Sequence, residues 1–214
     1  MFNQRLVNLY LFENKKAILP KLITLVICYS SLLLIMKFLS DRIKDIDVIR
    51  MYFSPFLYFT LPLCFVIWLG FLLSKYIAYD ADSFHFFHQK NKLYIFVFSL
   101  LEFVVVMIPL SIILCYNMIS LAELISVFAA LLLCGAEYYL LVFLSKNLFF
   151  AVGLLFLYMS YACFFYQGES NPLVYYSVAN LMQEIYPITI ILECLAALAI
   201  ILLAYILNLK ISEK

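Results

Sequence analysis

Long apolar runs, separated by short polar stretches, dominate the chain from residue 21 to residue 208. An α-helix needs roughly 20 apolar residues to cross the hydrocarbon layer of a membrane. Six runs are of about this length, so the pattern predicts six membrane-spanning helices. They are expected at Lys21–Phe38, Tyr52–Leu73, Leu93–Tyr116, Ala122–Leu144, Leu148–Tyr166 and Pro187–Asn208. Because only three residues separate the fourth run from the fifth, these two helices should be joined by a tight turn.

Residues 1–20 have a different pattern, in which polar and apolar positions can occupy opposite sides of a helix. The polar side would contain Gln4, Arg5, Asn8 and Lys15, and the apolar side Phe2, Leu6, Leu9 and Leu11. This pattern is typical of an amphipathic helix that lies in the membrane interface. The alternative is a frayed polar tail. We therefore expect an interfacial helix over 1–20, a six-helix membrane domain over 21–208 and a short tail over 209–214.

Composition supports an all-α integral membrane protein. The chain is 67% hydrophobic and only 13% charged, about half the charge of a typical soluble domain. Its four glycines are too few for a phosphate-binding loop, and no hydrolase or protease motif occurs, so we expect no enzyme activity, cofactor or metal in this chain. No run of basic residues suggests a nucleic-acid partner.

The distribution of Lys and Arg predicts the orientation of the helices. If the N-terminus is cytoplasmic, ten of the fourteen basic residues lie on the cytoplasmic side. The other four lie in or beside the first outer connection, at positions 37, 42, 44 and 50. Because cytoplasmic connections of membrane proteins are enriched in Lys and Arg, both termini should be cytoplasmic.

Three acidic residues, Glu102, Glu137 and Glu193, lie inside predicted spans. A charge near the middle of a bilayer costs about 2.5–3.5 kcal/mol even on the most lenient scale, and such residues often mark a translocation pathway. The alternatives are hydrogen bonds between helices and contact with a second subunit. Since no span is expected to contain a buried Lys or Arg, we expect no ion pair within the chain.

The connection between the second and third spans contains the sequence YDADSFHFFHQKNK at residues 79–92. Its phenylalanines are expected to be buried against lipid headgroups or in a groove of a partner protein. Asp82, His85 and His88 could share one face of a short helix, which raises the alternative of a metal site. A site at the membrane edge would lack the outer-shell partners that orient metal ligands, so the aromatic residues favour a docking helix.

The whole arrangement resembles permeases of the ABC-2 type exporter family. The similarity rests on the N-terminal interfacial helix, six spans with both ends inside, YDADSFHFFHQKNKLYIF between spans two and three, and a semi-apolar loop before span six. The Gly-Thr that usually follows the acidic residue in that family is absent here. The resemblance implies a coupling helix near 80–90 that docks into a separate ATPase subunit. Its contact residues would be Asp80, Asp82, Phe84, His85, Phe86, Phe87 and His88.

The same resemblance implies two permease chains and two ATPases in each transporter, with ATP and Mg bound by the ATPases. We expect a bacterial plasma membrane protein that exports an amphipathic peptide, a lipid-like compound or another hydrophobic substrate. The outer loop 167–186 could form part of an exit route or lie in the interface as an aromatic belt. Two other classes stay open: the substrate-binding membrane subunit of a vitamin-type importer, and a membrane scaffold or assembly protein.

Overall fold

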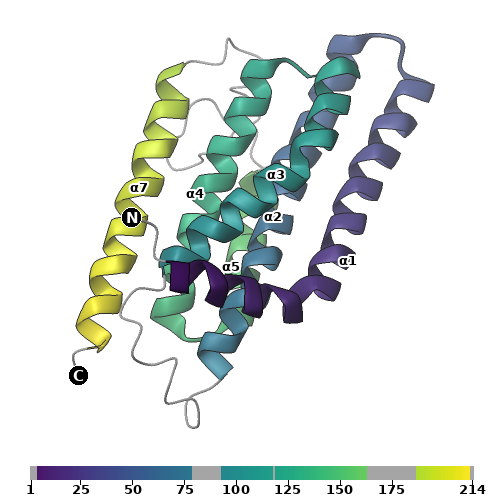
Figure 1. The fold of residues 1–214 in the computed structure, drawn as a ribbon. Coiled ribbons are helices and arrows are strands. Elements are labelled where there is room, and N and C mark those ends of the chain that lie inside the picture. Colours follow the sequence, from purple (N-terminus) through teal and green to yellow (C-terminus); the bar gives the residue numbers. More distant parts are fainter. Residues whose placement is uncertain (1–3, 79–92, 118, 163–186, 213–214) are drawn as a thin grey trace.

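The computed structural model describes residues 4–78, 93–117, 119–162 and 187–212. Within these ranges the chain is α-helical apart from short connections and a π-helical turn at residues 161–162, and it contains no β-strand. Figure 1 shows the described helices packed into a bundle. They are α1 (Gln4–Arg42), α2 (Ile46–Ala78), α3 (Leu93–Asn117), α4 (Leu121–Ser145), α5 (Leu148–Ser160) and α7 (Pro187–Ser212).

Five of these helices contain a segment that is long and apolar enough to cross a membrane. The segments are Ala17–Arg42, Ile46–Ser74, Leu93–Asn117, Leu121–Ser145 and Ile190–Leu207. Helix α5 has 13 residues, which corresponds to about 20 Å of helix. This is shorter than the hydrocarbon layer, and the last part of the predicted fifth span, 163–166, lies outside the described residues.

The N-terminal region and the first predicted span form one continuous helix, α1, with Pro20 inside it. In Figure 1 the first turns of α1 run across the bundle, and the helix then bends so that its remaining length runs along the bundle. Proline removes a backbone donor and is a common cause of such bends, so Pro20 accounts for the change of direction. The position of these first turns in the membrane interface stays a prediction.

The spans predicted at Lys21–Phe38 and Tyr52–Leu73 left too long an outer connection between them, because the structure reduces it to residues 43–45. The polar residues in this region belong to helix ends. Asp47 lies in the first turn of α2, where its carboxylate complements the helix dipole, and its backbone N–H donates to Oδ1 of Asp45 over 3.0 Å. Polarity there reflects capping of α2, which the hydropathy pattern does not distinguish from a loop.

The tight turn between the fourth and fifth predicted spans is confirmed. Ser145 ends α4, and Lys146 takes up a left-handed conformation with φ of 53° while its N–H donates to the Val142 carbonyl. Asn147 then caps α5, since its side-chain oxygen accepts a hydrogen bond from the Phe150 N–H over 3.2 Å.

Successive helices alternate in direction (Figure 1), so the bundle has two ends that can be named from α2. The Ala78 end contains the end of α2, the start of α3, the α4–α5 turn and the end of α7. The Ile46 end contains the α1–α2 connection, the end of α3 and the start of α4. Helices α2 and α4 occupy the centre, since 61% of the apolar window of each is buried, against 17–28% for α1, α3 and α7.

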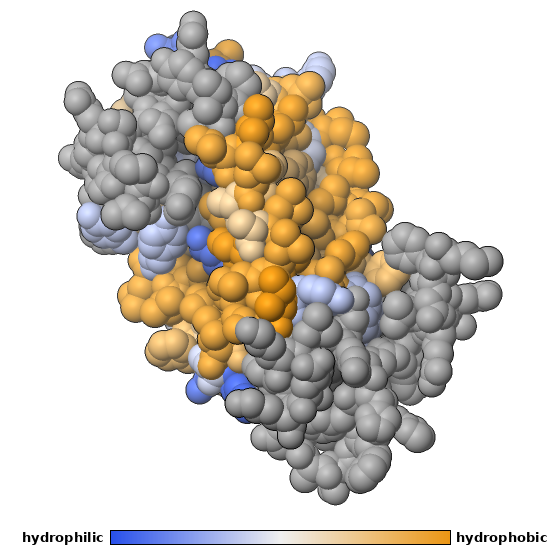
Figure 2. Space-filling view, turned by 90° about the vertical axis from the view of Figure 1, so that its left-hand side faces the viewer, coloured by the Kyte–Doolittle hydropathy of each residue, from blue (hydrophilic) through white to orange (hydrophobic). Residues whose placement is uncertain are grey.

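The outer surfaces of the peripheral helices are strongly apolar. Figure 2 views the molecule from the side of α7, where hydrophobic residues cover most of the described surface. Large exposed apolar side chains also lie along α1 and α3, for example Ile27 and Ile112. Soluble proteins rarely expose apolar surface on this scale, whereas helices that face lipid do. Together with the five long apolar helices, this surface indicates a multi-pass membrane protein.

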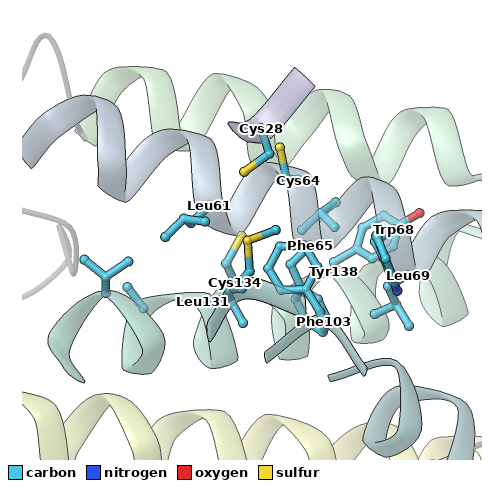
Figure 3. Close-up of a cluster of buried hydrophobic side chains, with 14 of the residues drawn as sticks. Cys28, Leu61, Cys64, Phe65, Trp68, Leu69, Phe103, Leu131, Cys134 and Tyr138 are labelled. Atoms are coloured by element: carbon cyan, nitrogen blue, oxygen red, sulfur yellow. The ribbon is translucent and has the colours of Figure 1, made fainter. Parts of the chain in front are cut away.

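The central core joins α2, α3 and α4 through aromatic rings (Figure 3). The Trp68 and Phe103 rings meet edge to face with centroids 5.5 Å apart, and the Phe65 and Phe103 centroids are 5.3 Å apart. Such contacts stabilise a particular mutual orientation of rings in addition to burying area. They fix Trp68, which is part of the polar cluster described next.

Candidate functional site

A buried lysine on α1 forms the centre of the first polar cluster, which we call the Lys21 cluster and define as Asn14, Lys21, Trp68 and Glu102. The Lys21 ammonium lies 2.5 Å from Oε2 of Glu102 on α3 and donates to Oδ1 of Asn14, also over 2.5 Å. Asn14 in turn donates through Nδ2 to Oε1 of Glu102 over 2.7 Å. The three side chains thus form a closed ring of charge-assisted hydrogen bonds.

The Trp68 ring completes this cluster from α2. The Lys21 ammonium lies 4.8 Å from the centroid of that ring, a distance at which a cation is attracted to the aromatic face. Lys21 retains only 3% of its accessible surface. A buried ammonium is costly unless it is paired, and here a carboxylate, an amide oxygen and a ring surround it.

The register of α1 explains why Lys21 faces the interior. Ala17, Lys21, Thr24, Cys28 and Leu32 are all buried and recur at intervals of three or four residues, which places them on one face of the helix. Residues between them, such as Ile23 and Ile27, are exposed. Lys21 therefore belongs to the packing face of α1, although it stands at the beginning of an apolar run.

The expectation that the chain has no buried cation to pair with an intramembrane glutamate was wrong. Lys21 was assigned to the cytoplasmic end of the first span, where a lysine ordinarily extends to the headgroups. In the structure α1 packs against α3 instead. The Lys21 ammonium then lies 2.5 Å from Oε2 of Glu102. Glu102 thus takes part in hydrogen bonding between helices, and its place on a translocation pathway stays a prediction.

The partners of Lys21 come from the two helices on either side of the connection 79–92. Trp68 lies ten residues before the end of α2, and Glu102 lies nine residues after the start of α3. Lys21 therefore ties these two helices to each other and to α1 at similar distances from the connection.

A second cluster lies near the other end of α2, and we call it the Arg50 cluster, defined as Asp47, Arg50, Ser54, Ser120 and Glu123. Nε of Arg50 lies 3.6 Å from Oε2 of Glu123 on α4, and its NH1 lies 3.7 Å from Oδ1 of Asp47. The Ser54 hydroxyl donates to Oε1 of Glu123. The backbone N–H of Glu123 donates to the Ser120 side chain over 3.2 Å, which caps α4. The cluster thus joins α2 to α4.

Reasoning from the sequence missed Glu123, which is 3% exposed. It stands at the second position of the predicted fourth span and looks like a residue in the outer interface. The signal that could have identified it is the spacing Ser120-x-x-Glu123, which is typical of the start of a helix. Such a motif predicts the cap, but it does not predict that Arg50 and Ser54 of another helix would bury the carboxylate.

The Arg50 cluster lies near the Ile46 end of the bundle, whereas the Lys21 cluster lies about 15 Å along α2 from its Ala78 end. Arg50 and Trp68 are 18 residues apart on α2, which corresponds to about 27 Å along a helix. This distance is close to the thickness of a bilayer hydrocarbon layer, about 30 Å. In each cluster, oppositely charged side chains from different helices lie within ion-pair distance. Each cluster therefore joins the helices that carry these side chains.

The other predicted intramembrane acids lie elsewhere. Glu137 is partly buried on α4, and Glu193 is buried on α7 with 7% of its surface exposed. Among the residues that the structure describes, Oε2 of Glu193 has no hydrogen-bond partner. Nowhere in the described ranges do three or more His, Cys, Asp or Glu side chains gather closely enough to bind one metal ion, so Glu102, Glu137 and Glu193 do not form one metal site.

All of the predicted ATPase-contact residues lie outside the described residues, and so does the alternative metal site. They are Asp80, Asp82, Phe84, His85, Phe86, Phe87 and His88.

None of the protein-family models, curated proteins or solved structures compared with the chain matches it.

Proposed function

We propose that the chain is the permease subunit of an ATP-binding-cassette exporter, driven by a separate ATPase subunit that docks at residues 80–90. The observation that best supports this function is the position of Lys21. It contacts Trp68 and Glu102, which lie on the two helices that enter and leave the proposed docking segment.

The contacts of the Lys21 cluster would transmit a movement of the docking segment to the helix bundle. A displacement of the connection 79–92 is transmitted first to the end of α2 and the start of α3. Because Lys21 links both helices to α1, the three helices move together at the Ala78 end. This concerted movement would open or close that end in response to ATP binding by the partner, as alternating access requires.

The surface chemistry supports a hydrophobic or amphipathic substrate. The described surface is apolar over most of its extent, and most of the described charges lie in the two clusters and at helix ends. A peptide with an apolar face or a lipid-like compound could reach such a bundle from the membrane. The complete exporter would contain two permease chains and two ATPases in the plasma membrane.

Co-purification tests the assignment directly. The chain carries an affinity tag, is expressed in its own host and is purified in mild detergent. We expect a protein with an ATP-binding-cassette sequence to co-purify in equal amount. Replacement of Phe84, Phe86 and Phe87 by Ala should release it, because these rings are the proposed anchors in the ATPase cleft.

A matched control changes two exposed phenylalanines at the start of α5. These are Phe149 and Phe150, and their replacement by Ala should leave the ATPase bound. If no ATPase accompanies the unmodified chain, the permease assignment is wrong. Tight binding of a small solute by the isolated chain would then favour the importer subunit, and the absence of both properties would favour a scaffold.

A further inference from the structure

We propose that Cys28 and Cys64 form a thiol pair that a membrane-dissolved lipid hydroperoxide oxidises to a disulfide. Cys28 lies on α1 and Cys64 on α2, and both are free thiols in the structure. The inference goes beyond the proposed transport function and does not depend on it, because it concerns a chemical modification of the bundle itself.

The two thiols meet at the interface between α1 and α2. Figure 3 shows the Cys28 and Cys64 side chains extending from their two helices into the space between them, where they lie close enough to interact directly. Cys28 is fully buried and Cys64 is 5% exposed. Disulfide formation requires neighbouring backbones and side chains that point toward each other. Two cysteines that face each other on packed helices provide this arrangement without a rearrangement of the bundle.

Cys64 also lines a groove between α1 and α2 with a volume of about 270 Å³. The walls of the groove include Ile23 and Ile27 of α1 and Ile67 and Phe71 of α2. Ile23 and Ile27 are 51% and 57% exposed, so they belong to the apolar outer surface of the bundle that faces lipid. The groove therefore leads from the surrounding lipid to one member of the thiol pair.

The depth of Cys64 favours an acyl chain as the occupant of this groove. Cys64 lies 18 residues after Ile46 and 14 residues before Ala78, which places it roughly 20 Å or more from either end of α2. At this depth the solvent is hydrocarbon, so polar oxidants reach the thiol poorly. A lipid hydroperoxide carries its O–O group on the acyl chain itself. The groove thus admits the class of oxidant that is dissolved where the thiols are.

The reaction balances as a two-electron oxidation of two thiols. The Cys64 sulfur attacks the terminal oxygen of the hydroperoxide, an S–O bond forms, and the O–O bond breaks. The thiol proton passes to the departing alkoxide, which leaves a sulfenic acid on Cys64 and a lipid alcohol. The Cys28 sulfur then attacks the Cys64 sulfur, the S–S bond forms, and the sulfenic oxygen leaves as water with the Cys28 proton. One hydroperoxide is reduced for each disulfide formed.

Peptide mapping of the oxidised chain tests the pairing. The purified full chain in lipid nanodiscs is treated with linoleic acid hydroperoxide, its remaining thiols are blocked with N-ethylmaleimide in denaturant, and unreduced peptides are identified by mass spectrometry. We expect a link between Cys28 and Cys64 as the main disulfide, absent from the untreated chain. If no link forms, or if other cysteines are linked as often, the proposal is wrong.

Single variants test which thiol reacts first. Cys28→Ser removes the second thiol, so the sulfenic acid on Cys64 should persist and be captured by dimedone, a reagent for sulfenic acids. Cys64→Ser should give severalfold less capture at Cys28, which is fully buried and does not line the groove. Equal capture in the two variants would contradict attack from the groove.

A variant of the groove tests the route of the oxidant. Ile23→Trp fills the groove with a larger side chain and should slow formation of the link by the lipid hydroperoxide severalfold. Ile112→Trp adds the same ring to the exposed face of α3 and should leave the rate unchanged. Iodine, a small apolar oxidant, should link the pair in Ile23→Trp as fast as in the wild type. If Ile23→Trp does not slow the reaction with the hydroperoxide, the groove is not the route and the proposal is wrong.

Discussion

Replacement of the charged partners in the Lys21 cluster should destabilise the bundle unequally. Glu102→Gln removes the carboxylate that lies 2.5 Å from the Lys21 ammonium, and the Lys21 side chain is only 4% exposed. Breaking a buried ion pair typically costs about 3–5 kcal/mol. We expect about 3 kcal/mol here, because the introduced amide and Asn14 still accept hydrogen bonds from Lys21.

The reverse change, Lys21→Met, removes the ammonium from Glu102, whose side chain retains 28% exposure and can bind water. A cost of about 2 kcal/mol is therefore expected, below the range for fully buried pairs. The double variant removes both charges and keeps an amide pair between Asn14 and the introduced glutamine. It should cost about 1 kcal/mol, since replacing both members of a buried pair is often nearly neutral.

The measurement is reversible unfolding of the protein in mixed micelles by added dodecyl sulfate, followed by far-ultraviolet circular dichroism. Lys15→Met is a matched control on the same helix, because Lys15 is exposed, and its effect should stay within about 0.5 kcal/mol. The reasoning is refuted if Glu102→Gln is no more destabilising than this control. It is also refuted if the double variant costs the sum of the two single variants, about 5 kcal/mol, as independent sites would.

Three further expectations concern packing, capping and orientation. Gly135→Ala places a methyl group against the Phe65 ring in the core, so it should lower the unfolding free energy by about 1–3 kcal/mol in the same titration. Ser120→Ala removes the side chain that caps α4 at Glu123 and should cost about 1 kcal/mol; no measurable change would show that this cap contributes nothing. A cysteine at Ser83 should react with a membrane-impermeant thiol reagent only after cells are opened, and labelling of intact cells would invert the predicted orientation.

The lengths of the apolar runs predicted five of the long helices, because crossing a hydrocarbon layer imposes a minimum length that a sequence displays directly. The run after Leu93 became α3, and the three residues between the fourth and fifth runs became a capped turn. Helix ends were less predictable. Residues 46–51 were assigned to a loop for their polarity, whereas they form the first turns of α2.

The hydropathy pattern predicted neither polar cluster, and the reason is the same for both. Lys21, Arg50 and Glu123 all stand near ends of apolar runs, where a charged residue ordinarily faces water. Whether such a residue is buried depends on which helices pack together and in which register. A single sequence does not contain this information in its periodicity, so the pairing of Lys21 with Glu102 emerged only from the structure.

Site-specific photo-crosslinking in living cells tests the central claim most directly, which is that a separate ATPase docks on the connection between α2 and α3. A photoreactive amino acid is placed at Phe86, and a control is placed at Gln183 in the loop predicted to lie outside. We predict an adduct with an ATP-binding-cassette ATPase from position 86 and none from position 183. An ATPase adduct from position 183, or none from position 86, would contradict the proposed function.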